Sequence, residues 1–187
     1  MPAEACTLYG APSKVYVTLH FAAAAAAITA DVRWIGKRPT RMPESSLFML
    51  PLAHCPAHGG KAHGTAHGNA TRGWFLDKLG SWIEAADVIP DGGAGHLHAV
   101  GDSGARRSCR GGGTVRVVAL DSALLSVGRE TAFPTPLAPL TEAEASGGLT
   151  AVLHDNIWDV NYPMWYPYDK WTAIDANEHF RFSVRWA

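Results

Sequence analysis

Two histidines at alternate positions, His96 and His98, could carry chemistry. They flank Leu97 in a short segment that is typical of a β-strand, where residues i and i+2 point to the same side. If Leu97 enters the core, both imidazoles face solvent or a groove, which suits ligand binding, a two-histidine metal site or proton transfer. Two exposed polar positions on an edge strand are the alternative. No third ligand follows from the sequence, so no metal and no cofactor are predicted.

A second group of histidines lies between His54 and Gly73, where the tripeptide Ala-His-Gly recurs three times. Imidazoles and the Cys55 thiol are ligand types for zinc or copper. A metal site also needs fixed geometry and supporting contacts, which a Gly/Ala repeat does not supply. The segment has almost no large apolar residue to offset its folding entropy. We therefore expect a flexible His/Gly-rich insertion over residues 54–73.

Carboxylates are the residues that glycoside hydrolysis requires, as a pair about 5–10 Å apart across a sugar. Asp155, Asp159, Asp169 and Asp175 are of the right type, but nothing in the sequence fixes two of them on opposing walls. No nucleophile elbow, phosphate-binding loop or dinucleotide fingerprint is present in the sequence. No catalytic residue is assigned from these motifs.

The densest aromatic stretch is His154 to Tyr166, which holds two Trp and two Tyr among Asn and Asp residues. Each large ring buries about 150–250 Å², whereas the polar residues between the rings need hydrogen-bond partners. We expect an aromatic plug that closes one end of a β-sandwich and leaves some polar groups in a groove. With His96 and His98, the groove or carbohydrate-binding candidates are Asn156, Trp158, Asn161, Tyr162 and Trp165.

Short strands must position these residues. Lys14 to Phe21 alternates apolar and polar residues and predicts a half-buried strand, with the alternation resuming from Ile28 to Trp34 as the second strand of a hairpin. The C-terminal segment His179 to Trp186 alternates without interruption. Residues 74–88 fit an amphipathic helix or two short extended pieces joined at Gly80. Further strands are expected at 46–52 (as a central strand), 96–100, 114–120, 123–127 and 149–155, and a polar loop at 102–113.

The expected fold is all-β, an antiparallel β-sandwich of about eight or more short strands with the His/Gly-rich insertion. At 187 residues, one domain spans 1–187. Its parts are N-terminal strands at 14–53, the insertion at 54–73, and the remaining strands with the aromatic cap at 74–187.

Charge and cysteine content limit the partners and the compartment. The net charge of −1 gives no electrostatic case for nucleic acid or a membrane surface. Residues 15–30 resemble a secretory signal, but His20 interrupts them and they are too short to span a bilayer. None of the three cysteines forms a CxxC motif. We therefore favour a reducing, cytoplasmic compartment. Neighbouring arginines could lower the pKa of Cys109 and make it reactive, but we expect a free surface thiol.

A series of short motifs, in order, resembles a known family. It comprises Arg41-Met42-Pro43-Glu44, Leu76-Asp77-Lys78-Leu79-Gly80, Gly95-His96-Leu97-His98-Ala99-Val100, Leu120-Asp121-Ser122-Ala123-Leu124-Leu125, Phe133-Pro134-Thr135-Pro136-Leu137, Asn156-Ile157-Trp158, Asn161-Tyr162-Pro163-Met164-Trp165 and Phe180-Arg181-Phe182. The series resembles the C-terminal β-domain of large proteins related to family 38 glycoside hydrolases, the α-mannosidase type. Residues 54–73 and 105–113 look like insertions, and Asp159-Val160 and His154-Asp155 depart from the pattern.

The resemblance implies a domain without its own reaction centre. Such enzymes hold their zinc ion and nucleophilic aspartate on an N-terminal barrel, which 187 residues do not contain. The implied partner is therefore a missing or separate catalytic barrel whose sugar site this domain supports. This reading predicts an exposed apolar patch where the barrel docks.

Two other functions stay open from the sequence. The first is a stand-alone carbohydrate-binding module, in which Trp158, Tyr162, Trp165, Tyr166 and Tyr168 stack on sugar rings. It requires at least two coplanar exposed rings. The second is a small metal-dependent hydrolase that uses His96 and His98.

Overall fold

The computed structural model describes residues 1–22, 24–38, 44–52, 73–88, 97–109, 113–128, 148–156 and 177–187. Within these ranges the chain forms eleven strands, the short helix α1 (Ala3–Leu8) and a 3-10 turn (Ala85–Asp87). The strands are β1 (Lys14–Ala22), β2 (Ala27–Ile35), β3 (Glu44–Leu50), β4 (Phe75–Lys78), β5 (Ser81–Glu84), β6 (Leu97–Ala99), β7 (Ala105–Ser108), β8 (Thr114–Ala119), β9 (Leu124–Val127), β10 (Leu149–Asn156) and β11 (Glu178–Trp186).

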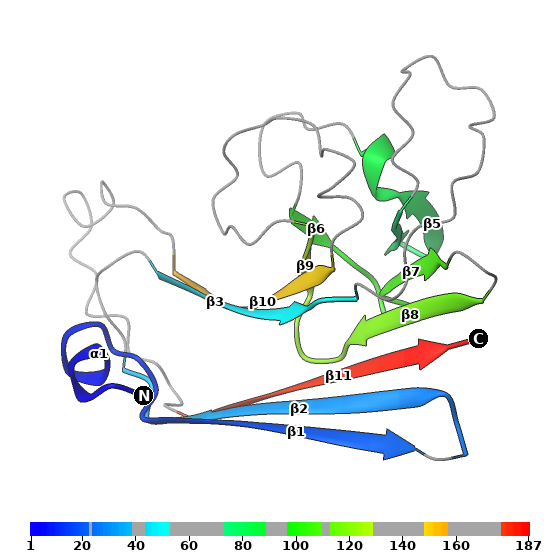
Figure 1. The fold of residues 1–187 in the computed structure, drawn as a ribbon. Coiled ribbons are helices and arrows are strands. Elements are labelled where there is room, and N and C mark those ends of the chain that lie inside the picture. The colour runs from blue at the N-terminus through cyan, green and yellow to red at the C-terminus, as the bar shows by residue number, and fades with distance from the viewer. Residues whose placement is uncertain are drawn as a thin grey trace, which may run out of the picture.

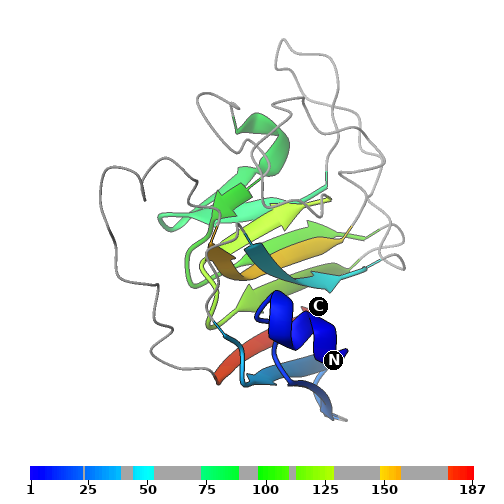
Figure 2. The same cartoon turned by 90° about the vertical axis from the view of Figure 1, so that its left-hand side faces the viewer.

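The strands form two sheets, and the predicted antiparallel β-sandwich is confirmed (Figure 1). The larger sheet has the order β1-β2-β11-β8-β7-β4-β5, and the smaller has the order β3-β10-β9-β6. The C-terminal strand β11 lies between β2 and β8, so the end of the chain joins the N-terminal hairpin to the rest of the large sheet. Figure 2 shows α1 beside that hairpin.

The first hairpin forms as the sequence predicts. Strands β1 and β2 pair from Lys14 opposite Ile35 to Ala22 opposite Ala27 without a register shift. The alanine run supplies the connection, in which the Ala25 N–H donates to the Ala22 carbonyl at 3.2 Å. Strand β2 is thereby placed between β1 and β11, which makes β1 the outermost strand of the large sheet.

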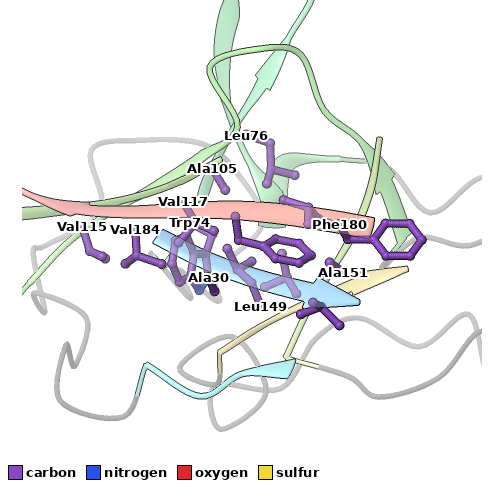
Figure 3. Packing of buried hydrophobic residues seen from close by; sticks show 14 of the residues in the cluster. Ala30, Trp74, Leu76, Ala105, Val115, Val117, Leu149, Ala151, Phe180 and Val184 are labelled. Atoms are coloured by element: carbon purple, nitrogen blue, oxygen red, sulfur yellow. The ribbon is translucent and has the colours of Figure 1, made fainter. Parts of the chain in front are cut away.

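The core fills the space between the two sheets (Figure 3). It takes alternate residues of β2, β8 and β11, as the period of a strand requires. Phe182 of β11 is fully buried and stacks on Phe48 of β3 with ring centroids 4.9 Å apart. Trp34 of β2 packs on Phe180 of β11 at 4.9 Å. The Phe48–Phe182 stack therefore connects the two sheets, while Trp34 and Phe180 pack beside each other within the large one.

Residues 74–88 form two extended pieces, the second of the two alternatives predicted for them. Leu79 and Gly80 join β4 to β5 with positive φ angles of 54° and 83°. The buried Asp77 carboxylate accepts hydrogen bonds from the Gly80 and Ser103 N–H groups, each at 2.9 Å. These bonds, that from Ser103 foremost, lower the pKa of Asp77. The turn thus depends on one acidic side chain as well as on a glycine.

Two predictions about where strands lie are wrong. The segment expected as part of a polar loop contains β7, which pairs with both β4 and β8. Its Arg107 is only 1% exposed, and its guanidinium lies over the Trp74 ring at 5.8 Å, where burial lowers its pKa. The arginines of this segment suggested a solvent-exposed loop, but the indole of Trp74 packs against the Arg107 guanidinium in the interior. The second error concerns β3, which is the edge of the small sheet and not a central strand.

Several predicted features lie outside the described residues. These are nearly all of the His/Gly-rich insertion, the motif from Phe133 to Leu137 and the aromatic plug from residue 157 onward. Of the described helices, none is long and apolar enough to cross a bilayer.

Candidate docking surface

The most unusual surface of the described structure is an apolar row on β1. Val15, Val17, Leu19 and Phe21, here called the β1 apolar strip, alternate along the strand and are 45–70% exposed. Every residue of β1 is exposed, so the prediction of a half-buried strand is wrong. The strip is a surface that the sequence pattern assigned to the core.

The strip lies on the core-facing side of the large sheet. Its members pair with Trp34, Val32, Ala30 and Ile28 of β2, and the first three of these are buried. The apolar rows thus continue from the core across β2 onto β1. They become exposed because the small sheet covers the inner strands, through contacts such as Phe48–Phe182 and Trp34–His154, whereas β1 lies at the far edge. Figure 1 shows β1 outermost, below β2 and β11.

The opposite face of the same three strands carries an acid between two imidazoles. Asp31 of β2 lies 3.3 Å from His20 Nε2 of β1 and 2.5 Å from His179 Nε2 of β11. The hydrogen bond with His179, followed by the nearby positive charges, lowers the pKa of Asp31. The cluster links β1 to β2 and β11 on the solvent side. The contact between His20 and Asp31 therefore holds β1 to β2 on this face, whereas the β1 apolar strip on the other face is exposed.

A second acidic contact fastens β11. The Arg181 guanidinium donates two hydrogen bonds to Asp121, at 2.8 and 2.9 Å, and the Arg181 N–H donates a third at 2.8 Å. The side-chain bonds lower the pKa of Asp121 and raise that of Arg181. The bidentate geometry orients the chain after β8 against β11.

His98 is the predicted site residue whose side chain is described, and it is buried at 2% exposure. It pairs with the core residue Leu125 of β9, so this histidine faces the interior instead of solvent or an open groove. The expectation of exposed imidazoles held only if Leu97 entered the core, and alternation alone does not decide which of the two faces is buried. The side of β6 that carries His98 is the core-facing side of the small sheet.

The side chains of the other candidate site residues are not among those that the structure describes. Asn156 ends β10 opposite Glu44, and its side chain is outside the described set. His96, Trp158, Asn161, Tyr162 and Trp165 lie outside the described residues altogether. The structure therefore does not bring the groove candidates together within its described part. There, no group of three His, Cys, Asp or Glu side chains is arranged to hold a metal ion.

Cys109 is disulfide-bonded, which contradicts the expected free thiol. Its partner lies outside the described residues, among which Cys6 is the free cysteine. Disulfides persist in oxidising compartments and are rare in the cytosol. The reducing compartment that the cysteine spacing suggested stays a prediction from the sequence.

Comparisons with protein-family models, with curated proteins and with solved structures found no match to the chain. The resemblance to the α-mannosidase type stays a prediction from the sequence.

Proposed function

We propose that this chain is a non-catalytic β-sandwich domain of a glycoside hydrolase-related protein of the α-mannosidase type. It works packed against a catalytic barrel, whose sugar site it supports. The observation that carries the proposal is the β1 apolar strip, because this reading requires an exposed apolar surface for the barrel.

The strip has the properties of a docking surface. Four apolar side chains, the largest of them Phe21 at 70% exposure, lie in one row and adjoin the core. Contiguous apolar surface of this kind is uncommon on monomers and marks contact sites. Covering the strip with another domain would extend the core across β1 and remove the apolar area from water, which is the main driving force for association. The strip therefore supports an accessory role.

Three of the described carboxyls support the same role by their electrostatics. A glycosidase acid must keep its proton near neutral pH and needs a raised pKa. Asp31, Asp77 and Asp121 instead accept hydrogen bonds that lower their pKa values. Each of the three stabilises a strand or a turn as a carboxylate, and this suits a structural use.

The first test is the genomic sequence immediately upstream of Met1, where an open reading frame for a barrel is expected. That barrel, expressed with this domain, should cleave a nitrophenyl α-mannoside, whereas the purified chain alone should not. Turnover by the chain alone would overturn the proposal. So would the absence of any barrel, joined or separate, from the same genome.

The second test places a charge in the contact. Leu19→Lys should abolish co-purification of the barrel with this domain, because the substitution puts an ammonium in the apolar strip. Thr18→Lys is the matched control, since Thr18 is exposed on the same strand but points to the opposite face. Equal binding by both variants would show that the barrel docks elsewhere.

A further inference from the structure

Among the described strands, β1 also has an edge on which no other strand pairs, and this edge is separate from its apolar face. It is the terminal strand of the large sheet and runs for nine residues in unbroken register with β2. Natural edge strands are blunted by prolines, bulges, short length or inward charges. The segment Lys14–Ala22 has no proline, and its one acid or base besides His20 is Lys14 at its start. Such an edge is suited to pair with another strand.

The hydrogen-bond ladder shows which β1 groups face that edge. The Trp186 N–H donates to the Ala26 carbonyl at 2.8 Å, so the even-numbered residues of β2 and β11 bond each other. In an antiparallel sheet, alternate residues bond to opposite sides, so the odd-numbered residues of β2 bond β1. Their partners in β1 are the even-numbered residues from Lys14 to Ala22. The outward N–H and C=O groups of β1 therefore belong to the β1 apolar strip.

We propose that a second copy of this chain occupies the edge, with the two β1 strands antiparallel about a two-fold axis at Thr18. In that register Val15 lies opposite Phe21 of the second copy, and Val17 lies opposite Leu19. These are the residues with outward backbone groups, so every such group finds a partner on the other strand. The two large sheets become one continuous sheet.

The sequence of β1 is self-complementary in this register. Apolar residues meet apolar residues on one face, while Tyr16 meets His20 and Thr18 meets Thr18 on the other. Threonine pairs are favourable cross-strand neighbours. Lys14 falls opposite Ala22, so no like charges face each other. An unrelated strand would need, by chance, both the same apolar alternation and an uncharged residue opposite Lys14. A second copy of β1 has both.

The size of the contact sets its strength. A nine-residue strand is about 30 Å long, and a depth of about 10 Å gives roughly 300 Å² per copy. Stable complexes bury about 800 Å² per partner, and smaller contacts are weak and transient. The dimer should therefore dissociate on dilution. Edge pairing leaves the apolar face of β1 open, so this inference does not depend on the proposed barrel.

The test is sedimentation equilibrium of the full chain from about 1 to about 300 µM, the range in which weak contacts dissociate. The mass should rise from 20.0 kDa towards twice that value. Thr18→Lys should weaken the dimer at least about tenfold, since it sets two like charges together at the two-fold axis. Thr29→Lys, on the same sheet face but on β2, should leave the dimer unchanged.

Amide hydrogen exchange of the full chain identifies the surface residue by residue. The Val15, Val17, Leu19 and Phe21 amides should gain protection as concentration rises, while the Tyr16 and His20 amides stay protected throughout. A mass of 20.0 kDa at all concentrations would overturn the proposal. So would a dimer that responds equally to both lysine substitutions or leaves the odd-numbered β1 amides unprotected. Because Thr18→Lys keeps the β1 apolar strip, loss of the dimer and loss of barrel docking are distinguishable.

Discussion

Two phenylalanines on the same face of the large sheet should differ sharply in their contribution to stability. Phe182 is fully buried between the sheets, and truncating such a residue to alanine costs about 3–5 kcal/mol. Phe21 is 70% exposed on β1. A buried aromatic side chain covers about 150–250 Å², worth about 4–6 kcal/mol at 25 cal/mol per Å². Less than a third of that is covered at Phe21, so Phe21→Ala should cost only about 1–2 kcal/mol.

The assay is thermal unfolding followed by circular dichroism at about 2 µM, below the concentrations at which weak contacts form. One kcal/mol shifts Tm by about 2–4 °C in a chain of this size. Phe182→Ala should therefore lower Tm by about 6–20 °C, and Phe21→Ala by only about 2–8 °C. If Phe182→Ala does not fold, the milder pair Phe182→Leu and Phe21→Leu gives the same comparison.

Equal destabilisation by the two substitutions would refute the reasoning. It would mean that β1 is packed in the isolated chain and that the β1 apolar strip is not an available surface. A large loss at Phe21 that appears only at high protein concentration would instead place the residue in a contact between copies.

Three further predictions follow from individual contacts. Gly104→Ala should lower the free energy of unfolding, measured in urea, by at least about 2 kcal/mol more than Gly80→Ala. Both glycines have positive φ, but of the two only Gly104 would bring a Cβ against a backbone carbonyl oxygen, that of Val117 at 2.1 Å. Equal costs for the two substitutions would contradict this. The lowered pKa of Asp31, due mainly to its bond with His179, means that its contribution is present above about pH 4 and is lost as pH falls through the folded-state value. Asp31→Asn should therefore lose less stability than the unmodified chain between about pH 4.5 and pH 2, and parallel urea midpoints would count against the role of the carboxylate. Because Cys109 is disulfide-bonded, thiol titration of the denatured, unreduced chain should find fewer thiols than after reduction, whereas equal counts would exclude the bond.

The sequence predicts a strand wherever apolar and polar residues alternate, because successive side chains of a pleated strand point to opposite faces. The alternation of β11 and of the two strands of the β1–β2 hairpin was evident from the period of two. The end of β3 at Leu50 also follows from local chemistry, because Pro51 cannot continue the ladder. These features depend on neighbouring residues alone, so no tertiary contact is needed to specify them.

The candidate surfaces were much less predictable, because alternation distinguishes two faces without saying what covers either. The strip from Val15 to Phe21 has the pattern of a core strand, yet the small sheet does not extend over β1. His98 has the type of a surface ligand, yet its position opposite Leu125 places it inside. Arg107 is buried over Trp74 although its neighbours in sequence suggest a solvated loop.

The sequence by itself determined the all-β class, the antiparallel hairpins and most strand positions, since these follow from local periodicity and turn residues. Only the tertiary structure decided that β11 lies beside β2, that Asp31 bridges His20 and His179, and that β1 ends the sheet with its apolar side uncovered. The physical reason is that a residue of one sheet is buried only where the other sheet packs over it. A strand records which of its faces is apolar, and the extent of the opposing layer decides whether that face becomes core or surface.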